Sequence, residues 1–387
     1  MSWALHPLTE EQAEVQKLAR DFANAEIRPH AADWDQRAHF EPAIVKKLGE
    51  LGFLGMMLPE KYDGLGTDTG TYLIALEEIA AADASVAVLM SVHNSLPTQM
   101  ILRYGSDAQK DRFLKPMARG EILGAFALSE PDAGSDASAL AAQAVKDGDG
   151  WILNGTKSWV TNGNTAGAII AMARTDTGGS RRGARGIGAF IVTPDLAGFK
   201  VGKKEDKLGL RGSPTVQLNF DNMRVPARNL LGDETEGFVY AMQSLDNGRL
   251  GIAAQAIGIA RAALEYSVAY AADRKQFGKA IKEFEAIQFK LADMATRVSA
   301  SRALLHAAAA AKDRGQNVRQ FSSMAKLMAS ETAMWVTTQA VQIFGGYGYV
   351  KDYPVERLFR DAKVTEIYEG TSEIQRIVIA RALYGQS

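Results

Sequence analysis

The 387-residue sequence contains no cysteine and only five histidines, and its formal net charge is −1. Without cysteine the chain can form no disulfide, no thiolate metal site and no cysteine nucleophile. The histidines are scattered and none occurs in a His-Glu-x-x-His pattern, so we expect no metal site. A nucleic-acid-binding surface needs a strong excess of Lys and Arg, and the near-neutral charge balance argues against one.

The sequence also lacks a clear membrane span. One of its two longest runs without Lys, Arg, Asp or Glu, residues 84–102, has about the length of a span. That run contains His93, Asn94 and Pro97, so we expect a buried or cleft-lining helix. Residues 1–7 are too short and too lightly charged for a targeting peptide, which favours a cytoplasmic protein and leaves a processed mitochondrial matrix protein open. No Walker motif and no nucleophile elbow occurs, and no Gly-x-Gly-x-x-Gly follows a predicted strand.

The composition is that of a globular protein with two or three domains, because 47% of the residues are hydrophobic and 23% are charged. Residues 1–121 have helical periodicity and begin with a capping box at residues 9–12. Over residues 122–232 short apolar runs alternate with turn signals, which predicts a small antiparallel β domain. Residues 233–387 are Ala-rich and helical, which predicts a helical bundle. The expected fold class is therefore α+β.

The same patterns predict individual elements. Helices are expected at residues 42–51, 71–82, 84–102, 108–118, 235–272, 284–313 and 317–344. Strands are expected at residues 124–128, 151–153, 168–173, 187–192 and 215–220, with hairpin turns at 147–150 and 178–179. The last three helices exceed the usual length, which suggests a bundle that also packs against other subunits. The basic segment 180–185 could bind a polyanion, but we interpret it as an exposed, mobile hairpin tip.

A stretch near the C-terminus, residues 366–376, places a glutamate where a general base could act. Apolar residues on both sides have helical spacing, Gly370 interrupts them, and a Thr-Ser pair can cap the next helix. Glu369 therefore lies at a helix–loop–helix junction, from which its side chain can point into a cleft. A carboxylate beside Tyr368 and partly stripped of water would have a raised pKa. The alternative is an ordinary exposed glutamate in a turn.

Two segments of the β domain could bind a flat heterocycle. Residues 126–136 join a strand to a turn and offer hydroxyls and backbone N–H groups, which can bind a ring edge and a phosphate. Trp159 and Thr161 are two residues apart and so share one face of a strand. An indole beside a hydroxyl suits an aromatic ring that also needs a hydrogen bond. A β core with one tryptophan is the alternative.

Two charged segments also allow two interpretations. Residues 273–278 close a long helix with Arg274 and Lys275, which complements the helix dipole and could also contact a phosphate. Asp246 and Arg249 lie three residues apart on a helix, and this spacing is equally that of a surface pair.

Taken in order, these motifs resemble those of the acyl-CoA dehydrogenase family, and most closely its short-chain (butyryl-CoA) members. The resemblance spans the whole chain. Its matching positions are residues 59–66, 127–131, 134–136, 154–157, 159, 161–163, 207–213, 274–278, 342–346 and 367–371. It implies a helical N-terminal domain (1–121), a central antiparallel β domain (122–232) and a C-terminal four-helix bundle (233–387), with FAD bound between them.

The resemblance also implies site residues. Those at the isoalloxazine ring of FAD would be Phe126, Leu128, Ser129, Trp159 and Thr161. Those at the pyrophosphate and adenine side, across a subunit interface, would be Arg274, Gln276, Phe277, Gln342, Gly345 and Gly346. Further FAD contacts would be Ser135, Thr371 and Glu373. Substrate contacts would be Ser135 near the CoA portion, with Asp246, Arg249, Tyr368 and Gly370.

In the mechanism that the resemblance implies, Glu369 removes the pro-R α-proton of an acyl-CoA thioester while flavin N5 takes a hydride from the β-carbon. The backbone N–H of Glu369 and the flavin ribityl 2′-hydroxyl would hold the thioester oxygen. Electrons would pass to an electron-transferring flavoprotein. The enzyme would be a homotetramer, a dimer of dimers, serving fatty acid β-oxidation or branched-chain amino acid catabolism.

Two positions bear on these expectations. Gly248 stands where some members of the family carry the base, so Glu369 is the one candidate at either position. Phe126 stands where many relatives have tyrosine, and its ring can still cover a flavin.

The sequence leaves alternatives open for both the activity and the substrate. An acyl-CoA oxidase, reoxidised by O2, is disfavoured because the common oxidases carry an extra C-terminal domain. A non-catalytic acyl-CoA-binding homologue is disfavoured because the base and the FAD contacts are present. Butyryl-CoA, isobutyryl-CoA and 2-methylbutyryl-CoA all remain open as substrates.

Overall fold

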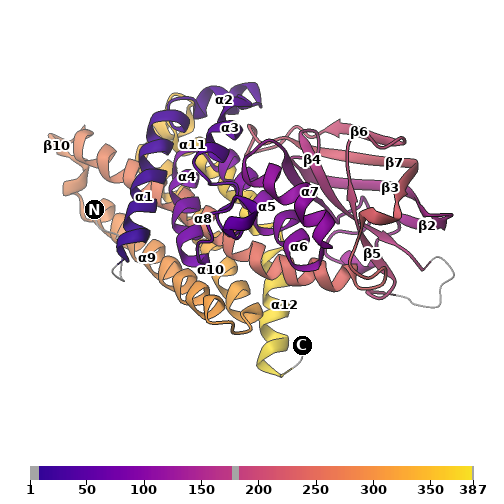
Figure 1. The fold of residues 1–387 in the computed structure, drawn as a ribbon. Coiled ribbons are helices and arrows are strands. Elements are labelled where there is room, and N and C mark those ends of the chain that lie inside the picture. Colours follow the sequence, from indigo (N-terminus) through magenta and orange to yellow (C-terminus); the bar gives the residue numbers. More distant parts are fainter. Residues whose placement is uncertain (1–7, 177–182, 386–387) are drawn as a thin grey trace.

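A computed structural model describes residues 8–176 and 183–385. A β sheet is attached to one end of a large helical body, and helices from both ends of the sequence build that body (Figure 1). The predicted turn at 178–179 and part of the basic segment 180–185 lie outside the described residues. None of the helices within the described ranges combines the length and the apolar character that a membrane span needs.

The N-terminal region is helical, as predicted. Its helices are α1 (Glu10–Phe22), α2 (Ala31–Arg37), α3 (Ala43–Glu50), α4 (Thr69–Ala82), α5 (Ala84–Ser95), α6 (Pro97–Tyr104) and α7 (Asp107–Ala118). The capping box is confirmed, because the Thr9 side chain accepts from Gln12 N and the Gln12 side chain accepts from Thr9 N.

The segment 84–102 is buried as expected, but it is not one helix. Pro97 disfavours helical backbone at the preceding Leu96, whose φ and ψ are −108° and −83°. Helix α5 ends there and α6 begins with the proline in its first turn. All residues of α5 are buried.

The central region forms one twisted sheet beside the helices (Figure 1). Its strands are β1 (Leu123–Ala127), β2 (Gln143–Asp147), β3 (Gly150–Thr161), β4 (Ala166–Arg174), β5 (Ile187–Val192), β6 (Phe199–Lys204), β7 (Thr215–Pro226) and β8 (Leu230–Leu231). The spatial order is β6-β7-β3-β2-β4-β5-β8, and β1 pairs with β4. The turn at 147–150 is confirmed as the β2–β3 hairpin.

Two features of the sheet differ from the sequence analysis. The sheet is not wholly antiparallel, because β1 runs parallel to β4 and Gln143 of β2 also pairs parallel with β4. The β2–β3 hairpin supplies the crossover that a parallel pair requires. Strands β2 and β6 were missed because they carry no apolar run: most of their residues are exposed.

The C-terminal region contains the long helices α8 (Gly237–Asp273), α9 (Glu285–Asp313) and α10 (Arg319–Phe344), followed by α11 (Val355–Lys363) and α12 (Ser372–Leu383). Each long helix begins and ends within two residues of its prediction. A short hairpin of β9 (Lys275–Gln276) and β10 (Lys279–Ala280) follows α8 and was not predicted. Helix α8 packs against α4, α5, α9 and α10, and so runs through the middle of the helical body.

Glycines let α8 lie close to the N-terminal helices. A Cβ at Gly258 would come within 2.6 Å of both Ala80 Cβ and Glu77 O on α4, so only glycine fits there. One consequence is that charged side chains on these helices meet in the core.

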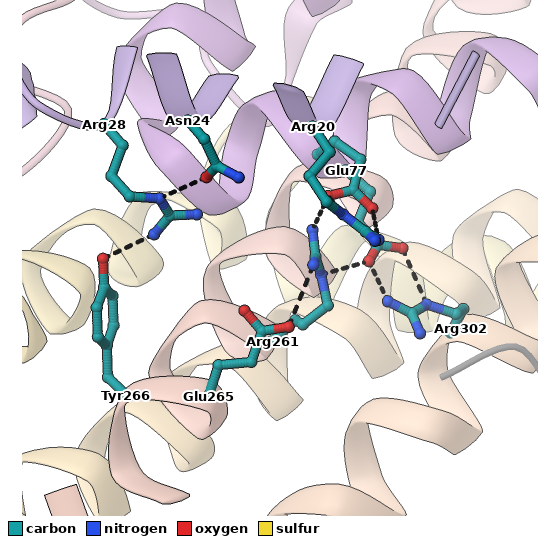
Figure 2. A network of polar contacts seen from close by, with 9 residues as sticks. Arg20, Asn24, Arg28, Glu77, Arg261, Glu265, Tyr266 and Arg302 are labelled. Carbon is teal, nitrogen blue, oxygen red and sulfur yellow. Dashed lines mark hydrogen bonds and ion pairs between the residues drawn. The ribbon is translucent and has the colours of Figure 1, made fainter. Parts of the chain in front are cut away.

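A buried ion network joins four helices (Figure 2). Arg261 of α8 lies 2.9 Å from Glu77 and 2.7 Å from Glu78, both on α4. Arg302 of α9 also pairs with Glu77, and Arg20 of α1 pairs with Glu78 at 2.8 Å. Each carboxylate therefore has two arginine partners, which offsets the cost of removing it from water.

Candidate functional site

Glu369 lies at the junction that the sequence predicts. Helix α11 ends at Lys363, a short 3₁₀ turn follows, and Thr371 caps α12 by accepting from Ile374 N at 3.4 Å. Glu369 and Gly370 both adopt left-handed backbone, with φ values of 51° and 91°. This conformation costs about 1–2 kcal/mol for a residue with a Cβ. The strained turn aims the Glu369 side chain inward.

The Glu369 carboxylate is pressed against α8. A Cβ built on Gly248 would lie 2.1 Å from Glu369 Oε2, so the absence of a side chain at Gly248 makes room for the acid. Glu369 as a whole residue is partly exposed, but both carboxylate oxygens are buried and accept no hydrogen bond from any described part of the chain. The interpretation as an exposed turn residue is therefore wrong.

Burial also sets the charge state of this acid. Burial raises the pKa of Glu369 to about 7, while the positive charges of Lys326 and Arg249 oppose that rise. Near neutral pH the carboxyl group can therefore both accept and release a proton, which is the property that a general base needs.

Asp246 and Arg249 lie in the same site and are not a surface pair. Arg249 is buried, and its Nη1 donates to Asp246 Oδ1 at 2.7 Å and to Ser323 Oγ of α10 at 3.2 Å. Burial lowers the pKa of Arg249 and raises that of Asp246, because both charges have lost water. The i, i+3 spacing predicts that the two side chains pair, but it does not indicate which face of α8 is buried.

The structure adds residues that the sequence analysis missed. Lys326 of α10 donates from Nζ to Gly370 O at 2.8 Å, and Gln255 of α8 accepts through Oε1 from the hydroxyl of Tyr368, itself a predicted contact. Gln375 of α12 donates to the Glu369 and Gly370 carbonyls at 3.1 and 2.8 Å. Lys326 could have been found from the sequence, because it falls on the helical stripe of small residues Ser322, Ala329 and Ala333.

A second group of predicted residues meets in the β domain. Lys157 is fully buried and its Nζ donates to Leu128 O at 3.1 Å and to Glu130 Oε1 at 2.6 Å. Ser158 N donates to Ser129 O at 2.9 Å. These bonds tie the loop after β1 to β3, and so bring Leu128 and Ser129 beside the segment that carries Trp159.

Trp159 is not part of a β core. Its side chain is 64% exposed, its φ is 61°, and the β3–β7 register shifts between Lys157 and Val160. Trp159 is exposed and Thr161 is half-buried, whereas Val160 between them is buried. An exposed indole on left-handed backbone is typical of a binding surface. The core tryptophan of this sheet is Trp151, which packs on Phe190.

A third group surrounds the hairpin after α8. A pocket of about 550 Å³ is lined by Arg274, Gln276, Gly345 and Gly346 together with Tyr270 and Tyr347. Nothing lies within 4 Å of a Cβ built on Gly345 or Gly346, so the pocket is open above them. Gln342 is exposed nearby, and Phe277 is 94% exposed.

The second and third groups do not meet in one chain. Helix α8 has 37 residues and is therefore about 55 Å long at 1.5 Å per residue. It runs from the β sheet to the β9–β10 hairpin, which lies at the opposite end of the molecule (Figure 1). Of the other predicted contacts, Ser135 and Glu373 are exposed, and Thr371 and Tyr368 are partly buried beside Glu369.

Comparisons with known proteins identify the family. Family models for the N-terminal, middle and C-terminal domains of acyl-CoA dehydrogenases match residues 9–121, 125–223 and 235–384. The chain is 50% identical to the mitochondrial short-chain specific acyl-CoA dehydrogenase of Mus musculus, over 96% of this chain and 90% of the mouse protein. The chain belongs to the acyl-CoA dehydrogenase family.

Solved acyl-CoA dehydrogenase structures agree with the fold. Butyryl-CoA dehydrogenase from Megasphaera elsdenii superposes with a TM-score of 0.95 at 45% identity, covering 98% of this chain and 100% of that one. A chain from a structure described as the electron-transferring flavoprotein of Acidaminococcus fermentans, studied for flavin-based electron bifurcation, gives a TM-score of 0.96 at 45% identity. It covers 98% of this chain and 99% of its own length.

Acyl-CoA dehydrogenases are flavoprotein oxidoreductases that generally depend on FAD. The residues present fit that cofactor: an exposed indole beside hydroxyls suits a flat ring, and an arginine above two unhindered glycines suits a pyrophosphate. Within the described ranges, no three His, Asp or Glu side chains gather as a metal site would require.

Proposed function

We propose that this chain dehydrogenates a short-chain acyl-CoA, straight or branched, to the 2-enoyl-CoA, with Glu369 as the base that removes the α-proton. The observation that carries the proposal is the Glu369 carboxylate: it is buried, accepts no hydrogen bond from the described chain, and has its pKa raised to about 7. An acid in this state is free to accept a proton from a C–H bond of a substrate that packs against it.

The backbone at Glu369 supports a second role. In the described chain its N–H donates to no acceptor, whereas the Glu369 carbonyl accepts from Gln375 and the Gly370 carbonyl accepts from Lys326 and Gln375. A free, fixed N–H beside the base can stabilise the negative charge that develops on the thioester oxygen as the α-proton leaves. Asp246, Arg249, Tyr368 and Gly370 surround this position and are proposed substrate contacts.

Bound FAD would supply the acceptor for the β-hydride, at flavin N5. We propose that the ring lies against Phe126, Leu128, Ser129, Trp159 and Thr161. The pyrophosphate and adenine side would meet the hairpin group of another subunit: Arg274, Gln276, Phe277, Gln342, Gly345 and Gly346. Ser135, Thr371 and Glu373 are the remaining proposed contacts. The length of α8 supports this division, because one FAD cannot reach both groups of a single chain.

A site divided in this way requires an oligomer, and we propose a homotetramer built as a dimer of dimers. Three regions, at 1–121, 122–232 and 233–387, would form each subunit. Light scattering is expected to give the mass of four chains. A stable monomer with full FAD content and full activity would overturn both the assembly and the divided site.

The relatives bear on the length of the acyl chain of the substrate. The short-chain dehydrogenase of mouse and the butyryl-CoA dehydrogenase of Megasphaera elsdenii support a short acyl chain. The decisive experiment mixes the enzyme anaerobically with butyryl-, isobutyryl-, 2-methylbutyryl- and longer acyl-CoAs and records bleaching of the flavin. Purified protein that carries no flavin and cannot be reconstituted would contradict the proposal.

The structure from Acidaminococcus fermentans supports an electron-transferring flavoprotein as the acceptor. The reduced enzyme is expected to be reoxidised much faster by such a flavoprotein than by air. Rapid reoxidation by O2 alone would instead indicate an oxidase.

Gly248→Ala tests the geometry of the base. The new methyl group would lie 2.1 Å from Glu369 Oε2 and 2.9 Å from Cδ, so the carboxylate must move. A displacement of about 1 Å can lower a rate about 10²-fold, and we expect a loss of that order in flavin reduction by butyryl-CoA. The fold should persist, because alanine favours a helix more than glycine does.

The matched control is Gly70→Ala in α4. There a Cβ would meet only Gln12 Nε2 at 3.5 Å and Asp68 Oδ1 at 3.6 Å, which are ordinary contacts. Flavin reduction in this variant should equal that of the wild type. Equal rates in Gly248→Ala and Gly70→Ala would show that Glu369 does not act from its present position.

A further inference from the structure

Lys326 is a buried lysine in a place where its charge is costly. Its side chain is fully buried on α10, in a stripe of small residues that packs in the helical core. Within the described ranges its ammonium group has a single hydrogen-bond acceptor, Gly370 O at 2.8 Å. An ammonium offers three donors, so this one hydrogen bond offsets only part of the free-energy cost of removing the charge from water. A methionine would fill a similar volume without that cost, so volume alone does not explain a lysine here.

The single hydrogen bond falls on the turn that aims the proposed base. Glu369 and Gly370 are consecutive left-handed residues, a conformation that persists only when its surroundings hold it. The Gly370 carbonyl accepts from Lys326 Nζ and also from Gln375 Nε2 at 2.8 Å. Lys326 thus fixes the turn from α10, while Gln375 fixes it from α12.

The charge of Lys326 also faces Glu369. Two cations face the carboxylate, Lys326 from α10 and Arg249 from α8, and Tyr72 of α4 and the adjacent Tyr368 are the other titratable neighbours. Arg249 is already paired with Asp246 at 2.7 Å. Lys326, by contrast, forms no ion pair with any described residue, and Glu369 is the carboxylate that acts on its charge most strongly.

More distant charges act on the lysine itself. Burial lowers the pKa of Lys326 to about 8, with Glu369 the main group opposing that change. Arg249 reinforces the lowering, and Glu366 and Glu373 oppose it. Arg319 faces Asp246 and Arg249 from the start of α10.

We propose that Lys326 is a positioning residue for Glu369: it holds the Glu369–Gly370 turn through the Gly370 carbonyl, and its charge favours the ionised carboxylate that accepts the α-proton. The inference rests on the proposed function, since it assigns Lys326 a part in the same step. The lysine touches neither substrate nor reacting atoms and acts only through Glu369.

Three variants separate the hydrogen bond from the charge. Lys326→Arg keeps both, Lys326→Gln keeps a donor without charge, and Lys326→Met removes both. The matched control is Lys363→Met, an exposed lysine whose partner is Glu366 at 2.6 Å. The measurement is the rate constant of flavin reduction by butyryl-CoA under anaerobic mixing, taken as a function of pH on both sides of neutrality, together with FAD content.

The wild-type rate should rise with pH through an apparent pKa near 7, since the base must be ionised. Loss of an opposite charge at close range raises the pKa of an acid by about one to three. The apparent pKa of the pH–rate profile should therefore move up by that amount in Lys326→Gln and Lys326→Met. At pH values below that apparent pKa, the rate should fall about tenfold for each pH unit. Lys326→Arg and Lys363→Met should keep the wild-type profile.

The outcomes distinguish this inference from the proposed function. If wild-type enzyme is reduced by butyryl-CoA but the glutamine and arginine variants share the wild-type pH profile, Lys326 does not tune Glu369, and the function stands. If wild-type enzyme is not reduced by any acyl-CoA, the proposed function itself fails. Should Lys326→Met not fold, the comparison of Lys326→Gln with Lys326→Arg still decides whether the charge of Lys326 acts on Glu369. A purely structural lysine would change FAD content or stability without moving the pH profile.

Discussion

Glu369→Gln is expected to lower the rate of flavin reduction by acyl-CoA by about 10²–10⁴-fold, the usual contribution of a positioned general base. Glutamine keeps the size of the side chain but removes the lone pair that takes the proton. Because both Glu369 oxygens accept no hydrogen bond within the described chain, the substitution breaks no contact that holds the fold. FAD content, melting temperature and binding of product-like ligands should change little.

Glu366→Gln is the matched control for this variant. Glu366 lies in the same junction but pairs with exposed Lys363 at 2.6 Å. Its glutamine variant should keep most of the activity in anaerobic stopped-flow mixing. Near-wild-type flavin reduction in Glu369→Gln would leave no candidate base, because Gly248 occupies the other position where the family carries one.

Arg261→Met is expected to reduce the free energy of unfolding by about 3–5 kcal/mol, the range for removing one partner from a buried ion pair. Arg261 is the residue that contacts both buried carboxylates of α4, at 2.9 Å from Glu77 and 2.7 Å from Glu78 (Figure 2). Without it, Glu77 keeps only Arg302 and Glu78 keeps only the half-exposed Arg20, so each buried carboxylate loses one of the two cations that offset its loss of water. Thermal and denaturant unfolding followed by circular dichroism would measure the loss.

The same network predicts how stability depends on pH. Burial alone would raise the pKa of Glu77, but the charges of Arg302 and Arg261 outweigh it and hold that pKa below its usual value. The folded state therefore gains stability above the unfolded-state pKa, and loses it as pH falls through the lower folded-state value.

The control for Arg261→Met is Lys17→Met, which breaks only the exposed Lys17–Asp21 pair and should leave the unfolding curve unchanged. Unfolding curves of Arg261→Met that match this control would contradict the account of the network.

Much of the fold follows from local patterns. The long helices α8, α9 and α10 begin and end close to their predicted positions because Ala-rich periodicity and Gly breaks act over a few residues. The predictions failed where contacts between strands, and not a local apolar pattern, determine the structure. Strands β2 and β6 have largely exposed residues and no apolar run, so only pairing with β3 and β7 makes them strands. The parallel β1–β4 pair likewise depends on which strands become neighbours in the sheet, and no local pattern specifies that.

Local sequence patterns are enough to predict the order of the regions, the ends of the long helices and the position of Glu369 in a capped junction, since these depend on residues close together in the chain. Three features become visible only in the folded chain: Gly248 makes room for the carboxylate, Arg249 is buried, and Lys326 faces the turn. Burial and electric field at Glu369 come from α8 and α10, far away in sequence. Desolvation and Coulombic attraction depend on distance in space, and a pattern along the chain does not contain that distance.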